Sequence, residues 1–123
     1  MDKPVFHLLI ADDDEGMRYA IRRLVSRHYP AAKISEAGNG GEALKLYERT
    51  GADLMIVDYR MPQMDGIEFV RALKERASST PIIMVSSHLV AREEGMAAGV
   101  TAFVDKGDLV KTLIHVMEPL ILK

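Results

Sequence analysis

The stretch LLIADDDEGM, residues 8–17, joins a short apolar run to a cluster of acidic residues. Leu8–Ala11 is apolar at every position, which is typical of a strand that is buried on both faces of a parallel sheet. Four acidic residues follow at positions 12–15. The last two have an ordinary interpretation, because carboxylates after a strand often cap the next helix. For the first two, Asp12 and Asp13, a cap and a functional site are both open interpretations.

The composition describes one ordinary domain. The chain has 123 residues, of which 48% are apolar and 28% are charged, and this suits a single core. The formal charge of −2 gives no basic surface for direct contact with nucleic acid or an anionic membrane. The lack of cysteine excludes disulfides and cysteine catalysis. No apolar stretch near the start is long enough for a signal peptide or a membrane span, so we expect a single cytoplasmic domain over residues 1–123.

Short apolar runs alternate with longer segments that have a helical period. The predicted strands are Leu8–Ala11, Lys33–Ala37, Leu54–Val57, Ile82–Val85 and Ala102–Val104. A strand followed by a helix, five times over, predicts a doubly wound α/β fold in which helices cover both faces of a five-stranded parallel sheet. In such folds, ligands bind beyond the carboxyl ends of the strands, where the strand order reverses.

Two of the helical segments carry more specific expectations. After the first strand, an apolar stripe that includes Met17 and Ile21 predicts a helix with one buried side. The arginines of that helix are expected on the opposite side, and they are Arg18, Arg22, Arg23 and Arg27. In the fourth helical segment Gly95 costs about 1 kcal/mol relative to alanine, so we expect that helix to be short or mobile.

Polar residues follow the predicted strands at the edge where ligands are expected. Asp12 and Asp13 follow the first strand, Asp58 the third, Ser86 the fourth, and Lys106 comes just after the last. Two like charges about 4 Å apart repel by roughly 4 kcal/mol at an effective dielectric constant near 20, so three clustered carboxylates need a shared cation. Oxygen ligands without histidine or cysteine favour a hard ion, and Mg²⁺ suits a site that leaves room for water and phosphate.

Several motifs occur together in a recognisable order. They are Asp12-Asp13, the segment Glu36–Leu44, Asp58 with Met61-Pro62 and Asp65-Gly66, Ser86, and Lys106. At these spacings the chain resembles the receiver domains of two-component response regulators over nearly its whole length. The resemblance implies a flavodoxin-like strand order, 2-1-3-4-5. It also implies either a stand-alone regulator or the receiver part of a larger one.

The resemblance implies a phosphorylation site. Asp58 corresponds to the phosphoacceptor, which takes a phosphoryl group from a phosphohistidine of a histidine kinase or phosphotransfer protein. Ser86 and Lys106 would each bind a phosphoryl oxygen, which places polar groups where phosphoryl transfer needs them. Water would later hydrolyse the aspartyl phosphate. The chain would therefore be a signalling switch with its own phosphotransfer and autophosphatase chemistry, rather than an enzyme.

A metal site and a conformational readout are implied in the same way. Asp12, Asp13, Asp58 and the backbone carbonyl of Arg60 would hold Mg²⁺. Phe103 on the last strand would turn inward as the Ser86 hydroxyl moves toward the phosphate, although a plain core aromatic remains an open interpretation of Phe103.

Lifetime and output are further expectations. Arg60 lies two residues after Asp58, and His88 two after Ser86. In the family that the chain resembles, these positions shape water access to the phosphoryl group, so we expect them to tune its lifetime. A downstream effector domain or protein would read the phosphorylated state. A homodimer through the face of the fourth helix, fifth strand and fifth helix is a further expectation.

One departure from the family pattern concerns the lysine. Gly107 stands where a proline usually follows. A cis bond to a residue other than proline costs about 3 kcal/mol, so we expect a trans peptide. The position of Lys106 is therefore less constrained than in the family.

Two other classes of protein remain as alternatives. Asp12-Asp13-Asp14 also fits a haloacid dehalogenase-like phosphatase, an enzyme in which Asp12 would be the nucleophile. Such enzymes usually have a longer chain and a later acidic pair for the metal. A flavodoxin-like FMN binder would share the fold, but its first loop should offer hydroxyls and amides to phosphate instead of carboxylates.

Overall fold

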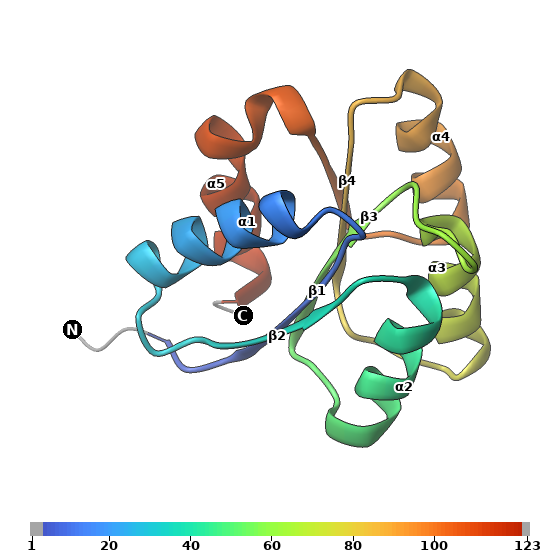
Figure 1. The fold of residues 1–123 in the computed structure, drawn as a ribbon, viewed down its shortest axis with the longest axis horizontal. Coiled ribbons are helices and arrows are strands. Elements are labelled where there is room, and N and C mark those ends of the chain that lie inside the picture. Colours follow the sequence, from blue (N-terminus) through green and yellow to red (C-terminus); the bar gives the residue numbers. More distant parts are fainter. Residues whose placement is uncertain (1–3, 122–123) are drawn as a thin grey trace.

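Strands and helices alternate along the whole described chain (Figure 1). The computed structural model describes residues 4–121. The strands are β1 (His7–Ala11), β2 (Lys33–Ala37), β3 (Leu54–Asp58), β4 (Ile82–Ser86) and β5 (Ala102–Asp105). The helices are α1 (Glu15–His28), α2 (Gly40–Thr50), α3 (Gly66–Glu75), α4 (Leu89–Ala98) and α5 (Leu109–Ile121), with a 3-10 turn at Lys106–Asp108. None of the helices in this part of the chain is both long and apolar enough to span a membrane.

The five strands form one parallel sheet in the order β2-β1-β3-β4-β5. This confirms the predicted doubly wound fold and its strand order. The chain moves from β1 outward to β2 and then returns to the other side of β1 with β3, so the order reverses between β1 and β3. Ala11 is paired with Val57 across this point. The residues that follow these two therefore emerge next to each other.

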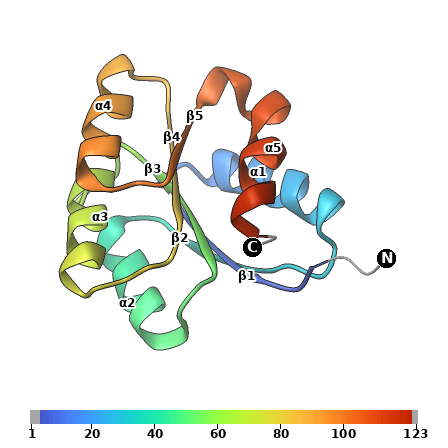
Figure 2. The same ribbon diagram turned by 180° about the vertical axis from the view of Figure 1, so that it is seen from behind.

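Helices cover both faces of the sheet. Figures 1 and 2 show α1 and α5 on one side and α2, α3 and α4 on the other. Side chains alternate between the two cores along β1: Leu8 and Ile10 pack with residues of α1 and α5, whereas Leu9 and Ala11 pack with residues of α2 and α3. Burial on both faces explains why the central strands are apolar throughout.

The prediction for the arginines of α1 is half wrong. Arg23 and Arg27 are exposed, but Arg18 and Arg22 are partly buried. Both form ion pairs with Glu36 on the edge strand β2. Their long side chains turn toward β2 instead of extending into solvent, because Glu36 offers them an acidic partner on that strand.

Of the two alternatives predicted for α4, short or mobile, the first is wrong. This helix has ten residues, as many as α3. Gly95 lies on its buried side, where an added Cβ would come within 2.9 Å of the Met84 sulfur. Here the glycine allows the helix to approach β4 closely, and the packing offsets its low helix propensity.

Candidate functional site

Three carboxylates meet at the carboxyl edge of the sheet. Asp12 follows β1, Asp58 ends β3, and the pairing of these two strands brings them side by side. Together with Asp13, each offers one carboxylate oxygen, and these three oxygens lie within 4.8 Å of one another. Asp12 and Asp58 are buried, whereas Asp13 is exposed. The convergence predicted from the strand ends is therefore present.

The Asp12 carboxyl is held in an unfavourable environment for its charge. Its Oδ1 accepts a hydrogen bond from the Asp14 amide at 2.9 Å. Burial raises the pKa of Asp12 to about 6, and the negative charge of Asp58 adds to this effect, while the Asp14 amide and Lys106 oppose it. A divalent cation would relieve this accumulation of negative charge.

Asp14 itself has the ordinary role that was predicted from its position. It is the N-cap of α1, and its side chain accepts hydrogen bonds from the amides of Gly16 and Met17. The cap and the metal-binding candidates are thus different members of the same acidic cluster.

Asp58 is paired with Lys106. The Lys106 Nζ lies 3.1 Å from Asp58 Oδ1, and Asp58 is only 5% exposed. Burial raises the pKa of the Asp58 carboxyl, and the like charge of Asp13 adds to this effect, while the hydrogen bond and charge of Lys106 only partly oppose it. Residues 4–121 contain no cis peptide bond, so the Lys106–Gly107 peptide is trans as predicted, and the lysine still reaches the cluster.

Ser86 ends β4 and is buried beside β3, the strand that Asp58 ends. Its Oγ accepts a hydrogen bond from the His88 amide at 3.0 Å and lies 3.2 Å from His88 Nδ1. The His88 ring is 5.9 Å from the Tyr59 ring, and the Tyr59 hydroxyl donates a hydrogen bond to Glu94 of α4. Tyr59 and Glu94 were not predicted as site residues, because their contact joins positions 35 residues apart.

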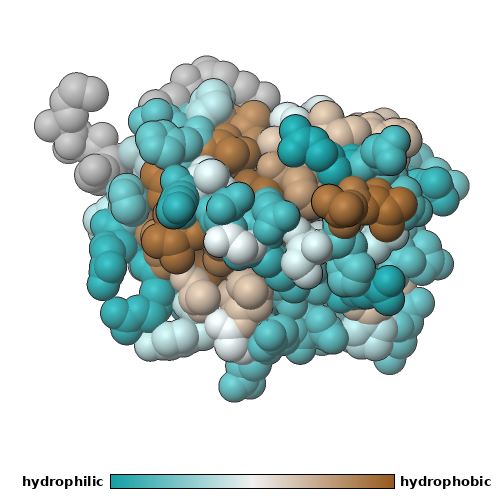
Figure 3. Space-filling model, turned by 90° about the horizontal axis from the view of Figure 1, so that it is seen from above, coloured by the Kyte–Doolittle hydropathy of each residue, from teal (hydrophilic) through white to brown (hydrophobic). Residues whose placement is uncertain are grey.

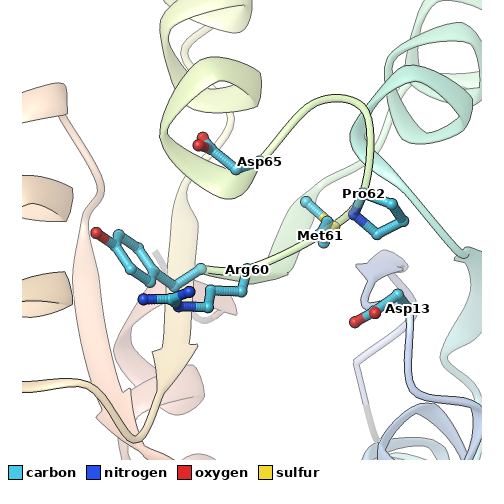
Figure 4. A pocket seen from close by; sticks show the side chains of 6 residues that line it. Asp13, Arg60, Met61, Pro62 and Asp65 are labelled. Atoms are coloured by element: carbon cyan, nitrogen blue, oxygen red, sulfur yellow. The ribbon is translucent and has the colours of Figure 1, made fainter.

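A pocket of about 520 Å³ opens beside Asp13 (Figure 4). The lining residues are Asp13, Tyr59, Arg60, Met61, Pro62 and Asp65. In Figure 4 the Arg60 side chain extends away from Asp13, which leaves the carboxylate open to the pocket. A small group could therefore reach the acidic cluster from this side.

The loop that follows Asp58 is held by close backbone contacts. The Gly66 amide donates to the Tyr59 carbonyl at 2.9 Å. A Cβ on Gly66 would lie only 2.4 Å from the Asp58 carbonyl oxygen, and a Cβ on Gly40 would lie 2.4 Å from the Met64 carbonyl oxygen. Asp65 caps α3 through a capping box with Glu68. The backbone of Asp58 is therefore in close contact with Gly66, the first residue of α3.

Phe103 lies on β5, and its side chain is partly buried against the core that includes α3. The guanidinium carbon of Arg92 is 5.8 Å from the centre of its ring. Phe103 is therefore neither fully inside nor fully outside the core, and both interpretations made from the sequence stay open.

The cluster suits a hard divalent cation. It offers carboxylate oxygens without histidine or cysteine, which is the donor set that Mg²⁺ prefers. The three oxygens are close enough to share one ion. Burial is the main cause of the raised pKa values of Asp12 and Asp58, and a bound cation would favour the charged forms that burial disfavours. The residues present thus fit the metal that the sequence predicted.

The parallel sheet and the acidic pocket at its switch point are typical of phosphoacceptor domains in signalling. Residues 8–118 match the family model of the response regulator receiver domain, and the chain belongs to this family. Receiver domains are parts of two-component signalling systems and typically act in signalling rather than as catalytic enzymes. The resemblance stated from the motifs is confirmed.

Individual relatives agree with this assignment. The chain is 37% identical over 98 residues to the chemotaxis protein CheY of Halobacterium salinarum, covering 80% of this chain and 78% of that protein. It is 32% identical over 126 residues to a protein-glutamate methylesterase/protein-glutamine glutaminase of Nocardioides, covering 96% of this chain. The chain spans only 34% of the length of that second protein.

Solved structures show the same fold. The receiver domain of Francisella response regulator 1452 superposes with a TM-score of 0.85 at 26% identity, covering 97% of each chain. The chemotaxis protein CheY4 of Vibrio cholerae superposes with a TM-score of 0.82 at 27% identity, covering 93% of this chain and 97% of that one.

Proposed function

We propose that the chain is a phosphorylatable switch that accepts a phosphoryl group on Asp58 from the phosphohistidine of a histidine kinase or phosphotransfer protein. A carboxylate oxygen of Asp58 attacks phosphorus, the bond from phosphorus to the imidazole nitrogen breaks, and the imidazole leaves. The observation that carries the proposal is the place of Asp58 within the acidic triad, paired with Lys106 at 3.1 Å. Phosphoryl transfer depends chiefly on such alignment and on charges near the phosphoryl oxygens.

We further propose that Asp12, Asp13, Asp58 and the backbone carbonyl of Arg60 hold Mg²⁺. When bound, the ion would neutralise negative charge on the phosphoryl oxygens. Support comes from the three oxygens within 4.8 Å of one another and from the pKa of Asp12, which burial raises to about 6. Arg60 lines the adjoining pocket, and its side chain leaves that pocket open (Figure 4).

Ser86 and Lys106 are proposed to bind two phosphoryl oxygens. The Ser86 hydroxyl now contacts His88, so it would exchange this partner for the phosphoryl group. Phe103 is the proposed reporter, turning further into the core when Ser86 moves. Its half-buried position on β5 beside Arg92 is compatible with such a movement.

Arg60 and His88 are proposed to tune the lifetime of the phosphoryl group. His88 lies against both Ser86 and Tyr59, and Arg60 borders the pocket beside Asp13. Both side chains are exposed, so they can limit how water approaches Asp58 without being part of the core.

The output surface is proposed to lie on α4, β5 and α5, as a homodimer contact or a contact with an effector. Leu89 is 94% exposed and Val110 78% exposed at the starts of α4 and α5. Figure 3 looks down on this end of the molecule, which is mostly hydrophilic with hydrophobic side chains in separate patches. A stand-alone regulator and the receiver part of a longer protein both suit this proposal.

The test is phosphorylation with a small-molecule phosphodonor and Mg²⁺, followed by mapping of the modified residue by mass spectrometry. The proposal expects acid-labile label on Asp58 and none in Asp58→Asn, while Asp108→Asn, an exposed acid of the 3-10 turn, serves as the matched control. Unchanged labelling of Asp58→Asn would contradict the proposal. Label on Asp12 would instead support the alternative of a haloacid dehalogenase-like phosphatase.

A further inference from the structure

A bridge of side chains from α1 to the edge strand β2 lies beside the acidic triad, and none of the roles proposed above uses it. Arg18 donates from Nε to Glu36 Oε1 at 3.0 Å and from Nη1 to the Asp12 carbonyl oxygen at 2.7 Å. Arg22 donates to the other Glu36 oxygen at 2.6 Å. One guanidinium therefore joins a side chain of β2 to the backbone of the acidic cluster.

The peptide that Arg18 contacts is the link between the first two acids of the cluster. The Asp12 carbonyl and the Asp13 amide belong to one planar unit, so fixing one fixes the other. The Asp12 amide donates to the Ala37 carbonyl at 3.0 Å, and the Asp12 carboxylate accepts from the Asp14 amide at 2.9 Å. These two bonds hold the Asp12 amide and side chain, and neither involves the Asp12 carbonyl. Arg18 holds that carbonyl.

The orientation of Asp13 depends on this restraint. Its side chain is exposed, whereas Asp12 and Asp58 are buried and surrounded by packed atoms. The direction of the Asp13 carboxylate is therefore set largely by the backbone that carries it. Arg18, whose side chain is only 18% exposed and is anchored by Glu36, is placed to hold that backbone.

We propose that Arg18 is a positioning residue for the divalent metal site, and that Glu36 acts through it. The inference rests on the proposed Mg²⁺ site. Partners in the outer shell that orient metal ligands typically contribute 10- to 100-fold in metal affinity. The planar fork of arginine reaches two acceptors at once, which the single ammonium group of lysine does not reproduce in the same geometry.

The test is calorimetric titration of the phosphate-free protein with Mg²⁺, under conditions in which circular dichroism shows every variant to be folded. Arg18→Met should raise the Mg²⁺ dissociation constant by about tenfold, and Arg18→Lys should recover part of the loss. Arg23→Ala is the matched control, because Arg23 is an exposed arginine of the same helix that contacts Tyr19. The Mg²⁺ dissociation constant of Arg23→Ala should equal that of the parent.

A second variant separates positioning from general stabilisation. If Glu36 acts through Arg18, the double variant Arg18→Met/Glu36→Gln should bind Mg²⁺ no more weakly than Arg18→Met alone. A purely structural role would lower the free energy of unfolding and leave the Mg²⁺ dissociation constant of Arg18→Met equal to that of the parent, which would overturn the inference. If Arg18→Met does not fold, Arg18→Lys and Glu36→Gln take its place, and a Mg²⁺ dissociation constant equal to that of the parent in both would overturn the inference. Failure of the parent to bind Mg²⁺ would overturn the proposed metal site and this inference together.

Discussion

Lys106 and Asp58 form an ion pair across the carboxyl edge of the sheet, with 3.1 Å between Nζ and Oδ1. Asp58 ends β3 and Lys106 follows β5, so β4 lies between the strands that carry them. Burial by itself lowers the pKa of a lysine, but the hydrogen bond and charge of Asp58 outweigh it and raise the pKa of Lys106. The pair therefore links the last strand to the acidic triad.

Replacing Lys106 should slow phosphorylation without preventing it. In Lys106→Ala we expect a rate of labelling at Asp58 about 100-fold lower, because a cation aimed at the developing charge of the phosphoryl group is removed. The rate is measured with a small-molecule phosphodonor at saturating Mg²⁺. Lys111→Ala, which alters an exposed lysine on α5, is the control. Equal rates for Lys106→Ala and the parent would show that the pair has no role in transfer.

Magnesium should stabilise the folded protein. Binding to the folded state alone raises the free energy of unfolding by about 2.7 kcal/mol when the ion is present at 100 times its dissociation constant. Urea unfolding with and without MgCl₂ measures this increase, with KCl at equal ionic strength as the control for screening. Asp13→Asn should abolish the increase, since it removes one of the three carboxylates. If MgCl₂ raised the free energy of unfolding of Asp13→Asn as much as that of the parent, the ion would bind at a different site.

Gly66→Ala should disturb the backbone of Asp58. The new Cβ would lie 2.4 Å from the Asp58 carbonyl oxygen, so the loop must shift, at a cost of about 1–3 kcal/mol typical of overpacking. Urea unfolding gives the stability change, and labelling at Asp58 should slow. Gly41→Ala is the matched control, because its Cβ would lie 3.4 Å from the nearest atom in ordinary contact. Similar losses in both variants would argue against a special role for Gly66.

The Glu36 bridge should stabilise the fold only while Glu36 is ionised. Burial disfavours its charge, but hydrogen bonds and charges from Arg22 and Arg18 outweigh burial and lower the Glu36 pKa. A lowered carboxyl pKa contributes stability above the ordinary value of about 4.3, and this contribution is lost as pH falls through the folded-state pKa. At pH 7, Glu36→Gln should be less stable than the parent by about 1 kcal/mol, and this difference should shrink in acid. A difference that stays constant with pH would contradict the ion pair.

His88→Ala should shorten the lifetime of the aspartyl phosphate. The ring lies beside Ser86 and Tyr59, so its removal should admit water to the site. The half-life after removal of the phosphodonor measures the effect, and His115→Ala, an exposed histidine on α5, is the control. A half-life equal to that of the parent would remove His88 from the residues that tune the switch.

The strands and the acidic triad could be predicted because their signals are local. Leu8–Ala11 and the runs like it are buried on both faces, and the acids come directly after them, so strand pairing alone brings Asp12 and Asp58 together. Lys106 could be predicted for the same reason, since a lysine side chain is long enough to reach past β4 from the end of β5.

Other parts depend on contacts between distant positions. The helical period of α1 predicted that Arg18 faces solvent. Instead, its side chain is hydrogen-bonded to Glu36 of β2, which lies 18 residues later in the chain. Likewise, helix propensity predicted that Gly95 would weaken α4, while the decisive fact is its closeness to Met84. The partner in each case becomes known only when the fold is known.

The contact between Tyr59 and Glu94 places a tyrosine chromophore directly after Asp58. The chain has four tyrosines and no tryptophan, so tyrosine dominates its near-ultraviolet absorbance and fluorescence. One of these chromophores follows Asp58 directly and is hydrogen-bonded to α4. A comparison of near-ultraviolet difference spectra of the parent and of Tyr59→Phe, each with and without phosphodonor, would therefore show whether this ring responds to modification of Asp58 in unlabelled protein.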